Sequence, residues 1–168
     1  MIDILLPFIS NEQIDEISRL IQRQFLEYQR LANTSAFQRL FREEYQAHER
    51  QHSISWALKS AFPSDSIIAG LRVSCMRDGG GYRRPELRNA NIIIHILSDK
   101  TKLQSKYLRE KYALNENGFE LPPVYCYFRV SAQDSFLKSL VLCVPDSDGE
   151  IIAEETLYER PRIEEVGA

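Results

Sequence analysis

Close to Ile67 the spacing of apolar residues changes, and this change limits the folds open to the chain. Before it, apolar residues recur every three or four positions over residues 11–32 and again up to Phe62, which indicates two amphipathic helices. After it, apolar residues form short runs bounded by turn residues, which indicates β-strands. Helices followed by grouped strands predict an α+β fold rather than a doubly wound parallel sheet.

The boundaries of the two helices carry local signals. Ser10 and Gln13 have the spacing of a capping box at the start of the first helix. The second helical pattern stops before Pro63, as expected from the restriction that proline places on the preceding residue. It carries two apolar stripes, so we expect it to pack on two sides.

Five segments after Ile67 have strand character, and one has helical character. The strands are expected near 67–76, 91–97, 124–130, 136–144 and 150–158, with a third helix from Asp99 to Gly118. The polar stretch 77–89 is expected to be a loop. The predicted fold is therefore two N-terminal helices followed by a mainly antiparallel sheet of about five strands, in the order β-β-α-β-β-β.

A chain of 168 residues has the length of one domain, and a composition of 43% hydrophobic and 27% charged residues excludes a disordered chain. We expect a single domain over 1–168, with a helical part (11–62), a β-β-α-β-β-β part (67–158) and a tail (159–168). No apolar run approaches a membrane span, and MIDILLPFIS lacks the pattern of a secretory signal.

Three cysteines lie in separate strand-like runs and form no CxxC pair: Cys75, Cys126 and Cys143. In such positions cysteine behaves as a small buried hydrophobe. Free thiols in an odd number favour a reducing compartment, and we expect a cytoplasmic protein without a membrane partner.

The net charge of −3 conceals a segregation of charge along the chain. Residues 72–111 hold ten Lys or Arg against four Asp or Glu, a net charge of +6. Residues 112–168 hold four against eleven, a net charge of −7. Such asymmetry is typical of a contact with nucleic acid or of an acid-rich tail.

The cationic centre supplies the candidate binding residues. Three glycines at 79–81 permit close backbone approach, and the following arginine pair can contact phosphates. Lysine and arginine then recur on one face of the expected third helix. The candidate residues for nucleic acid or another anionic partner are Tyr82, Arg83, Arg84, Arg88, Lys102, Lys106 and Arg109.

Tyr125 and Tyr127 alternate onto one side of their expected strand together with Arg129. If this side were open to solvent, it would form a stacking platform for single-stranded bases. The alternative is that the tyrosines are covered and only their hydroxyl groups reach the edge of the core.

His48-Glu49-Arg50-Gln51-His52 matches H-E-x-x-H within the second helix. Two histidines four residues apart can bind one Zn²⁺, and the glutamate can deprotonate the metal-bound water. These five residues resemble the zincin metallopeptidases, and the resemblance implies His48 and His52 as zinc ligands, Glu49 as catalytic base and peptide hydrolysis as the activity. A third ligand is required, and only His95 or Glu86 is a candidate. The alternative is two semi-buried histidines at the end of an aromatic stripe.

The function expected from the sequence is macromolecular binding, with nucleic-acid phosphate contact through residues 72–111 favoured and no cofactor required. An acidic protein surface is the alternative partner, in a protein-binding or regulatory role without catalysis. A zinc-dependent hydrolase at 48–52 is the alternative from a different class, and an oligomeric interface on the second helix is a further possibility. The sequence predicts no particular oligomeric state.

Overall fold

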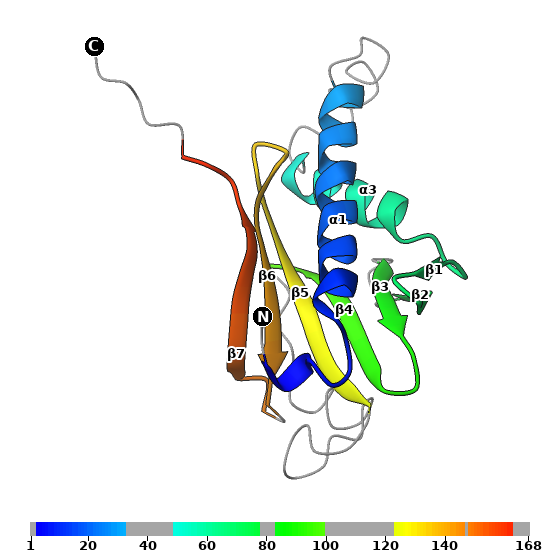
Figure 1. The fold of residues 1–168 in the computed structure, drawn as a ribbon. Coiled ribbons are helices and arrows are strands. Elements are labelled where there is room, and N and C mark those ends of the chain that lie inside the picture. The colour runs from blue at the N-terminus through cyan, green and yellow to red at the C-terminus, as the bar shows by residue number, and fades with distance from the viewer. Residues whose placement is uncertain (1–2, 33–48, 78–82, 100–122, 147, 163–168) are drawn as a thin grey trace.

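The computed structural model describes residues 3–32, 49–77, 83–99, 123–146 and 148–162 (Figure 1). The helices are the 3-10 turn η1 (Asp3–Leu5), α1 (Asn11–Ala32) and α3 (Glu49–Ala61). The strands are β1 (Ile67–Ile68), β2 (Leu71–Arg77), β3 (Arg83–Arg88), β4 (Ile92–Ser98), β5 (Val124–Gln133), β6 (Phe136–Pro145) and β7 (Ile151–Glu159). None of the helices in these ranges has the length and apolar character that a membrane span requires.

All seven strands belong to one sheet, and their order in the sheet is their order in the sequence, β1 to β7. Neighbouring strands are antiparallel except for β4 and β5, which are parallel. A parallel pair needs a crossover connection, and the chain between Ser98 and Val124 is long enough to supply it. The sheet is therefore mixed.

The fold class expected from the sequence is wrong in its sheet and in its balance of elements. The described residues form seven strands rather than about five, and more of them lie in strands than in helices, with one long helix and one shorter helix. One extra strand arises because the run from Ile67 is interrupted at Ala69 and Gly70. The other arises because Arg83–Arg88, expected in a loop, forms β3.

Helix α1 confirms the helix expected over residues 11–32. Its start is a capping box: the Gln13 backbone N–H donates to Ser10 Oγ at 3.1 Å, and the Ser10 N–H donates to Gln13 Oε1 at 2.9 Å. Its apolar stripe is buried, and the members are Ile14, Ile17, Ile21, Phe25 and Tyr28.

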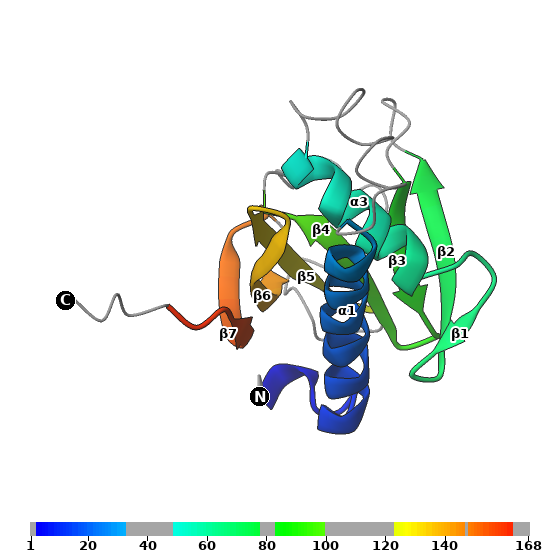
Figure 2. The ribbon, with the colours of Figure 1, turned by 90° about the horizontal axis from the view of Figure 1, so that it is seen from above.

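Both helices cover one face of the sheet (Figures 1 and 2). Helix α1 contacts β6, α3 contacts β3 and β5, and the two helices contact each other. The ring of Trp56 on α3 lies 5.7 Å from that of Tyr28 on α1. The expected second helix ends as predicted before Pro63, but its first part lies outside the described residues, as does the expected third helix.

Two tight turns attach α1 to the sheet. The turn between β1 and β2 contains Ala69 and Gly70, both with positive φ, and Gln13 Nε2 donates to Ala69 O at 2.7 Å. The turn between β5 and β6 contains Asp134 and Ser135, again with positive φ, as in a type I′ hairpin. Gln29 near the other end of α1 donates to Ser135 O at 2.5 Å. Both ends of α1 are thus tied to a turn of the sheet.

Candidate functional site

Two arginines face each other on neighbouring strands near one end of the sheet. In the register of β2 and β3, Arg72 is the direct partner of Arg88, and their side chains are 77% and 52% exposed. Directly opposed residues of an antiparallel pair project to the same face with Cβ atoms about 5 Å apart. The fold therefore holds two positive charges side by side in solvent.

Arg84 adds a third cation on this side of β3. It lies four positions before Arg88, and residues an even number of positions apart in a strand project to the same face. Arg84 is half-buried, whereas Arg88 is exposed. We refer to Arg72, Arg84 and Arg88 as the arginine face.

The arginine face borders a shallow depression of about 690 Å³. The depression is lined by Asp65, Ile67, Gly70, Arg72, Arg88 and Asn89. Three residues of the segment that leads into β2 have positive φ: Asp65 at 65°, Ala69 at 53° and Gly70 at 73°. For Asp65 and Ala69 this backbone region is unfavourable, with a cost of roughly 1 kcal/mol or more each. The wall of the depression is thus held in a strained conformation by the surrounding sheet.

Among the described residues, Arg72 and Arg88 each have a carboxylate neighbour. Asp65 Oδ1 lies 3.9 Å from Arg72, and Glu86 Oε1 lies 3.5 Å from Arg88. The exposed pair of Arg72 and Asp65 contributes only about 0–1 kcal/mol, and the buried Glu86 carboxylate has His95 as its closer partner. Both guanidinium groups can therefore exchange partners. The arginine face can therefore accept a phosphate or a carboxylate from outside.

A buried hydrogen-bonded cluster adjoins the arginine face. Glu86, on β3 between Arg84 and Arg88, contacts His95 of β4 with 2.9 Å between Oε2 and Nε2. His95 Nδ1 lies 3.1 Å from the hydroxyl of Tyr125 on β5. Since a carboxylate can only accept, His95 Nε2–H donates to Glu86, and in the neutral imidazole Nδ1 accepts the hydroxyl proton.

The electrostatics of this cluster favour an ionised Glu86. The hydrogen bond from His95 lowers the pKa of the Glu86 carboxyl below its ordinary value against the opposing effect of burial, with smaller electrostatic contributions from His95 and Arg88. His95 and Tyr125 are fully buried, and their rings meet edge to face at 5.2 Å. The cluster joins three neighbouring strands and fixes the position of the carboxylate beside Arg88.

The tyrosine side of β5 is covered. Tyr125 is fully buried and Tyr127 almost so, which excludes the stacking platform that an open face would have formed. Burial and the neighbouring Cys143 raise the pKa of Tyr127 to about 12. The expectation that the cysteines are free is confirmed: Cys126 and Cys143 are buried, Cys75 is half-buried, and burial raises the pKa of both buried thiols.

The H-E-x-x-H segment lies outside the side chains that the structure describes. His48 falls in an undescribed range, and Glu49 and His52 are placed only as backbone of α3. The two candidates for a third zinc ligand, Glu86 and His95, are hydrogen-bonded to each other. Within the described ranges, no group of three His, Cys, Asp or Glu side chains is arranged to hold a metal ion.

The structure brings together part of the predicted cationic site. Arg84 and Arg88 share a face of β3, whereas Tyr82, Lys102, Lys106 and Arg109 lie outside the described residues and Arg83 is placed only as backbone. Arg72 was missed as a site residue. Its position in the basic segment was the available signal, but only the register of β2 and β3 identifies it as the partner of Arg88.

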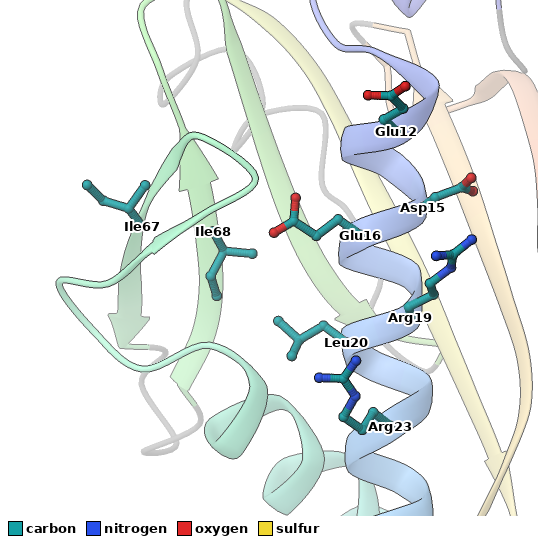
Figure 3. Close-up of a pocket in the computed structure, with 8 residues that line it drawn as sticks. All are labelled: Glu12, Asp15, Glu16, Arg19, Leu20, Arg23, Ile67 and Ile68. Carbon is teal, nitrogen blue, oxygen red and sulfur yellow. The ribbon is translucent and has the colours of Figure 1, made fainter.

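A second hollow, of about 540 Å³, lies between α1 and β1 (Figure 3). Glu16, Leu20 and Arg23 point from α1 toward β1, and Ile68 points back toward the helix. Carboxylates occupy the part of α1 that begins at Glu12, and guanidinium groups follow one and two turns later. Because carboxylates and guanidinium groups both line it, this hollow favours no single class of ligand.

In the part of the chain that the structure describes, these features define a protein whose seven-stranded mixed sheet carries α1 and α3 on one face and the arginine face near the β1 end. Comparison of the chain with known protein families, with curated protein sequences and with solved structures finds no match. Its function therefore has to be inferred from the charges, burial and contacts of its own residues.

Proposed function

We propose that this protein binds the phosphate backbone of nucleic acid through the arginine face. The observation that carries the proposal is the direct opposition of Arg72 and Arg88 on β2 and β3. Like charges directly opposed across an antiparallel pair destabilise the sheet. A phosphate bound between the two guanidinium groups would remove this repulsion. Its binding free energy would therefore include relief of an unfavourable interaction that is present in the free protein.

The surroundings of the arginine pair support a phosphate ligand. Guanidinium groups form paired hydrogen bonds with phosphate oxygens, and both arginines line the same open depression. The side-chain amide of Asn89, on the wall of the depression, can donate to a further oxygen. Contacts of this kind position a backbone without reading bases, so we expect binding that depends on salt and little on sequence.

The remaining candidate residues of the basic segment belong to the same proposal. They would extend the phosphate contact beyond the arginine face, and they are Tyr82, Arg83, Lys102, Lys106 and Arg109. The three free cysteines favour a reducing compartment, and we propose that binding takes place in the cytoplasm.

A salt titration tests the proposal. The purified chain is titrated against a labelled 30-nucleotide single-stranded RNA and a DNA duplex of the same length, between 50 and 300 mM KCl. We expect binding at low salt, with the logarithm of the association constant falling linearly with the logarithm of salt concentration. In the double variant Arg72→Ala/Arg88→Ala, the slope should fall by about two and the affinity by about tenfold or more.

The matched control is Arg19→Ala/Arg23→Ala, which removes two exposed arginines from α1 and leaves the arginine face intact. It should bind almost as the unmodified chain does. Absence of binding to either nucleic acid at 50 mM KCl would contradict the proposal, as would equal losses in the two double variants. Tighter binding to polyglutamate than to RNA would instead favour an acidic protein partner.

A further inference from the structure

At the end of the sheet opposite β1, strand β7 forms a long edge. It spans nine residues, Ile151–Glu159, and in the described part of the chain it pairs on one side only, with β6. An edge strand presents outward-facing N–H and C=O groups on alternate residues, which can pair with another extended chain. Ile152, near the start of the strand, is 53% exposed, and Ile151 beside it is also exposed.

The edge at β7 is strongly acidic. The segment 146–159 contains six Asp or Glu and no Lys or Arg. Glu154, Thr156 and Glu159 pair with Cys143, Val141 and Ser139, which alternate along β6, so these three β7 residues share one face. Arg129 on β5 lies 3.6 Å from Glu154 and neutralises part of this charge. The remaining carboxylates leave the edge negative.

A small apolar hollow adjoins the other face of β7, where α1 crosses the sheet. It has a volume of about 100 Å³, and Leu26, Phe136 and Tyr158 contribute to its lining. Leu26 is 70% exposed although it lies beside the buried Phe25. Arg160 covers the ring of Phe136, with 4.1 Å between the guanidinium carbon and the ring centroid. This hollow can accept one apolar side chain.

We propose that the β7 edge binds an extended cationic segment of a partner protein by strand addition. Neighbouring side chains of an added strand point to opposite faces. Lysine or arginine at alternate positions would meet the face of Glu154 and Glu159, and the apolar residues between them would meet the face of Tyr158 and the hollow. The segment recognised is therefore one in which basic and apolar residues alternate.

The charge of the edge also selects against a second copy of this chain. Two β7 strands pairing with each other would bring the carboxylates of both edges together, and like charges opposed across strands are unfavourable. A cationic segment replaces this repulsion with attraction. Strand addition at β7 is independent of the arginine face, which lies near the opposite end of the sheet.

Synthetic peptides test strand addition on the full chain. The probe is a fluorescein-labelled ten-residue peptide of alternating lysine and valine, and its affinity is measured by fluorescence anisotropy. The comparison probe has the same sequence with N-methyl groups on alternate residues, which keeps the charge but blocks pairing along one side of the peptide. We expect N-methylation to weaken binding by about tenfold or more, since several backbone hydrogen bonds are lost.

Variants of the protein locate the contact. Leu26→Ser should weaken binding of the lysine–valine peptide about fivefold, because it removes an apolar contact of the hollow. Leu6→Ser, a change of another exposed leucine away from this hollow, is the control and should leave binding unchanged. Glu159→Gln should weaken binding and flatten its salt dependence, whereas Glu16→Gln on α1 should do neither.

Hydrogen exchange gives a readout that does not depend on any variant. Bound peptide should slow exchange of amides within Ile151–Glu159 and leave the amides of β2 unchanged. The proposal would be overturned by equal binding of the N-methylated peptide, which would show charge attraction alone, or by protection elsewhere than β7. Absence of binding to the lysine–valine peptide would overturn it as well.

Discussion

Glu86 and His95 face each other across β3 and β4, and their hydrogen bond lies in the interior beside an exposed arginine pair. A buried carboxylate is unfavourable unless charged and polar neighbours compensate for the lost hydration. The hydrogen bond from His95 is the largest of the compensating interactions, and Arg88 adds smaller ones. The stability of the sheet near the arginine face is therefore coupled to the ionisation of one side chain.

We predict that this coupling appears as a dependence of stability on pH. Because the folded-state pKa of Glu86 is lowered, its contribution is present above the unfolded pKa and is lost as pH falls below about 4. Glu86→Gln should reduce the free energy of unfolding by roughly 1.5–3 kcal/mol at pH 7. Urea unfolding at pH 7, 5 and 3 should show that the difference between the two proteins shrinks toward pH 3.

The control for this measurement is Glu16→Gln, which removes an exposed carboxylate on α1. Its unfolding curve should follow that of the unmodified chain at each pH. A difference between Glu86→Gln and the unmodified chain that stayed constant from pH 7 to pH 3 would contradict the role given to the Glu86 carboxylate.

The sequence could predict only part of the candidate site. The basic segment indicated Arg84 and Arg88, because a cluster of lysine and arginine residues can be recognised from the sequence alone. The opposition of Arg72 and Arg88 could not be predicted, since it depends on the register between two strands. The bond between Glu86 and His95 could not be predicted either, because Glu86 was expected in a loop, where it would have no fixed neighbour across a strand.

Among the elements, α1 is stabilised by two hydrogen bonds of the Gln13 side chain. The side chain accepts a hydrogen bond from the N–H of Ser10 at the helix start and donates one to Ala69 O in the turn between β1 and β2. The first bond satisfies a backbone donor near the helix start. The second connects the helix to a turn with positive φ at both central positions.

We predict that Gln13→Ala destabilises the protein more than Ser10→Ala. Loss of the Ser10 hydroxyl should lower the free energy of unfolding by about 1 kcal/mol, the usual effect of removing an N-cap. Gln13→Ala should lower it by about 2 kcal/mol, because two hydrogen bonds are lost. Urea denaturation measures both, and Ser60→Ala, at an exposed position within α3, is the control. Equal effects of Gln13→Ala and Ser10→Ala would contradict the role of the bond to Ala69.

Element boundaries were predictable where local signals are strong. The capping box of α1, the stop before Pro63 and the hairpin between β5 and β6 are all set by residues close in sequence. Strand β3 was missed because Pro85 is uncommon inside strands. The structure accommodates Pro85 because β3 pairs with β4 only from Glu86 onward, so the missing N–H lies beyond that ladder.

At the scale of the whole molecule, charge is separated across the sheet. The arginine face lies on β2 and β3 near one end, and the carboxylates of β7 lie at the other. In the described part of the chain, positive and negative charge thus gather at opposite ends of the sheet. The two proposed ligands, a phosphate backbone and a cationic polypeptide segment, would bind at opposite ends without competing.

The sequence predicts a single domain, and this prediction can be tested by unfolding the whole chain. Helices α1 and α3 contact strands from both halves of the sheet, so we expect one cooperative transition. Fluorescence of Trp56 on α3 and circular dichroism at 222 nm should give the same urea midpoint. Midpoints that differ between the two signals would indicate units that unfold separately.

The strand order also has a consequence for folding during synthesis. Because each strand lies beside the next one in sequence, the sheet can grow in the order in which the ribosome produces it, with the crossover between β4 and β5 as the slowest closure. Helix α1 is made before the described strands but packs on β6, and the bond from Gln29 to Ser135 spans 106 residues. The apolar stripe of α1 is thus without its strand partner until β6 has been translated, which leaves apolar surface of the nascent chain without this cover during synthesis.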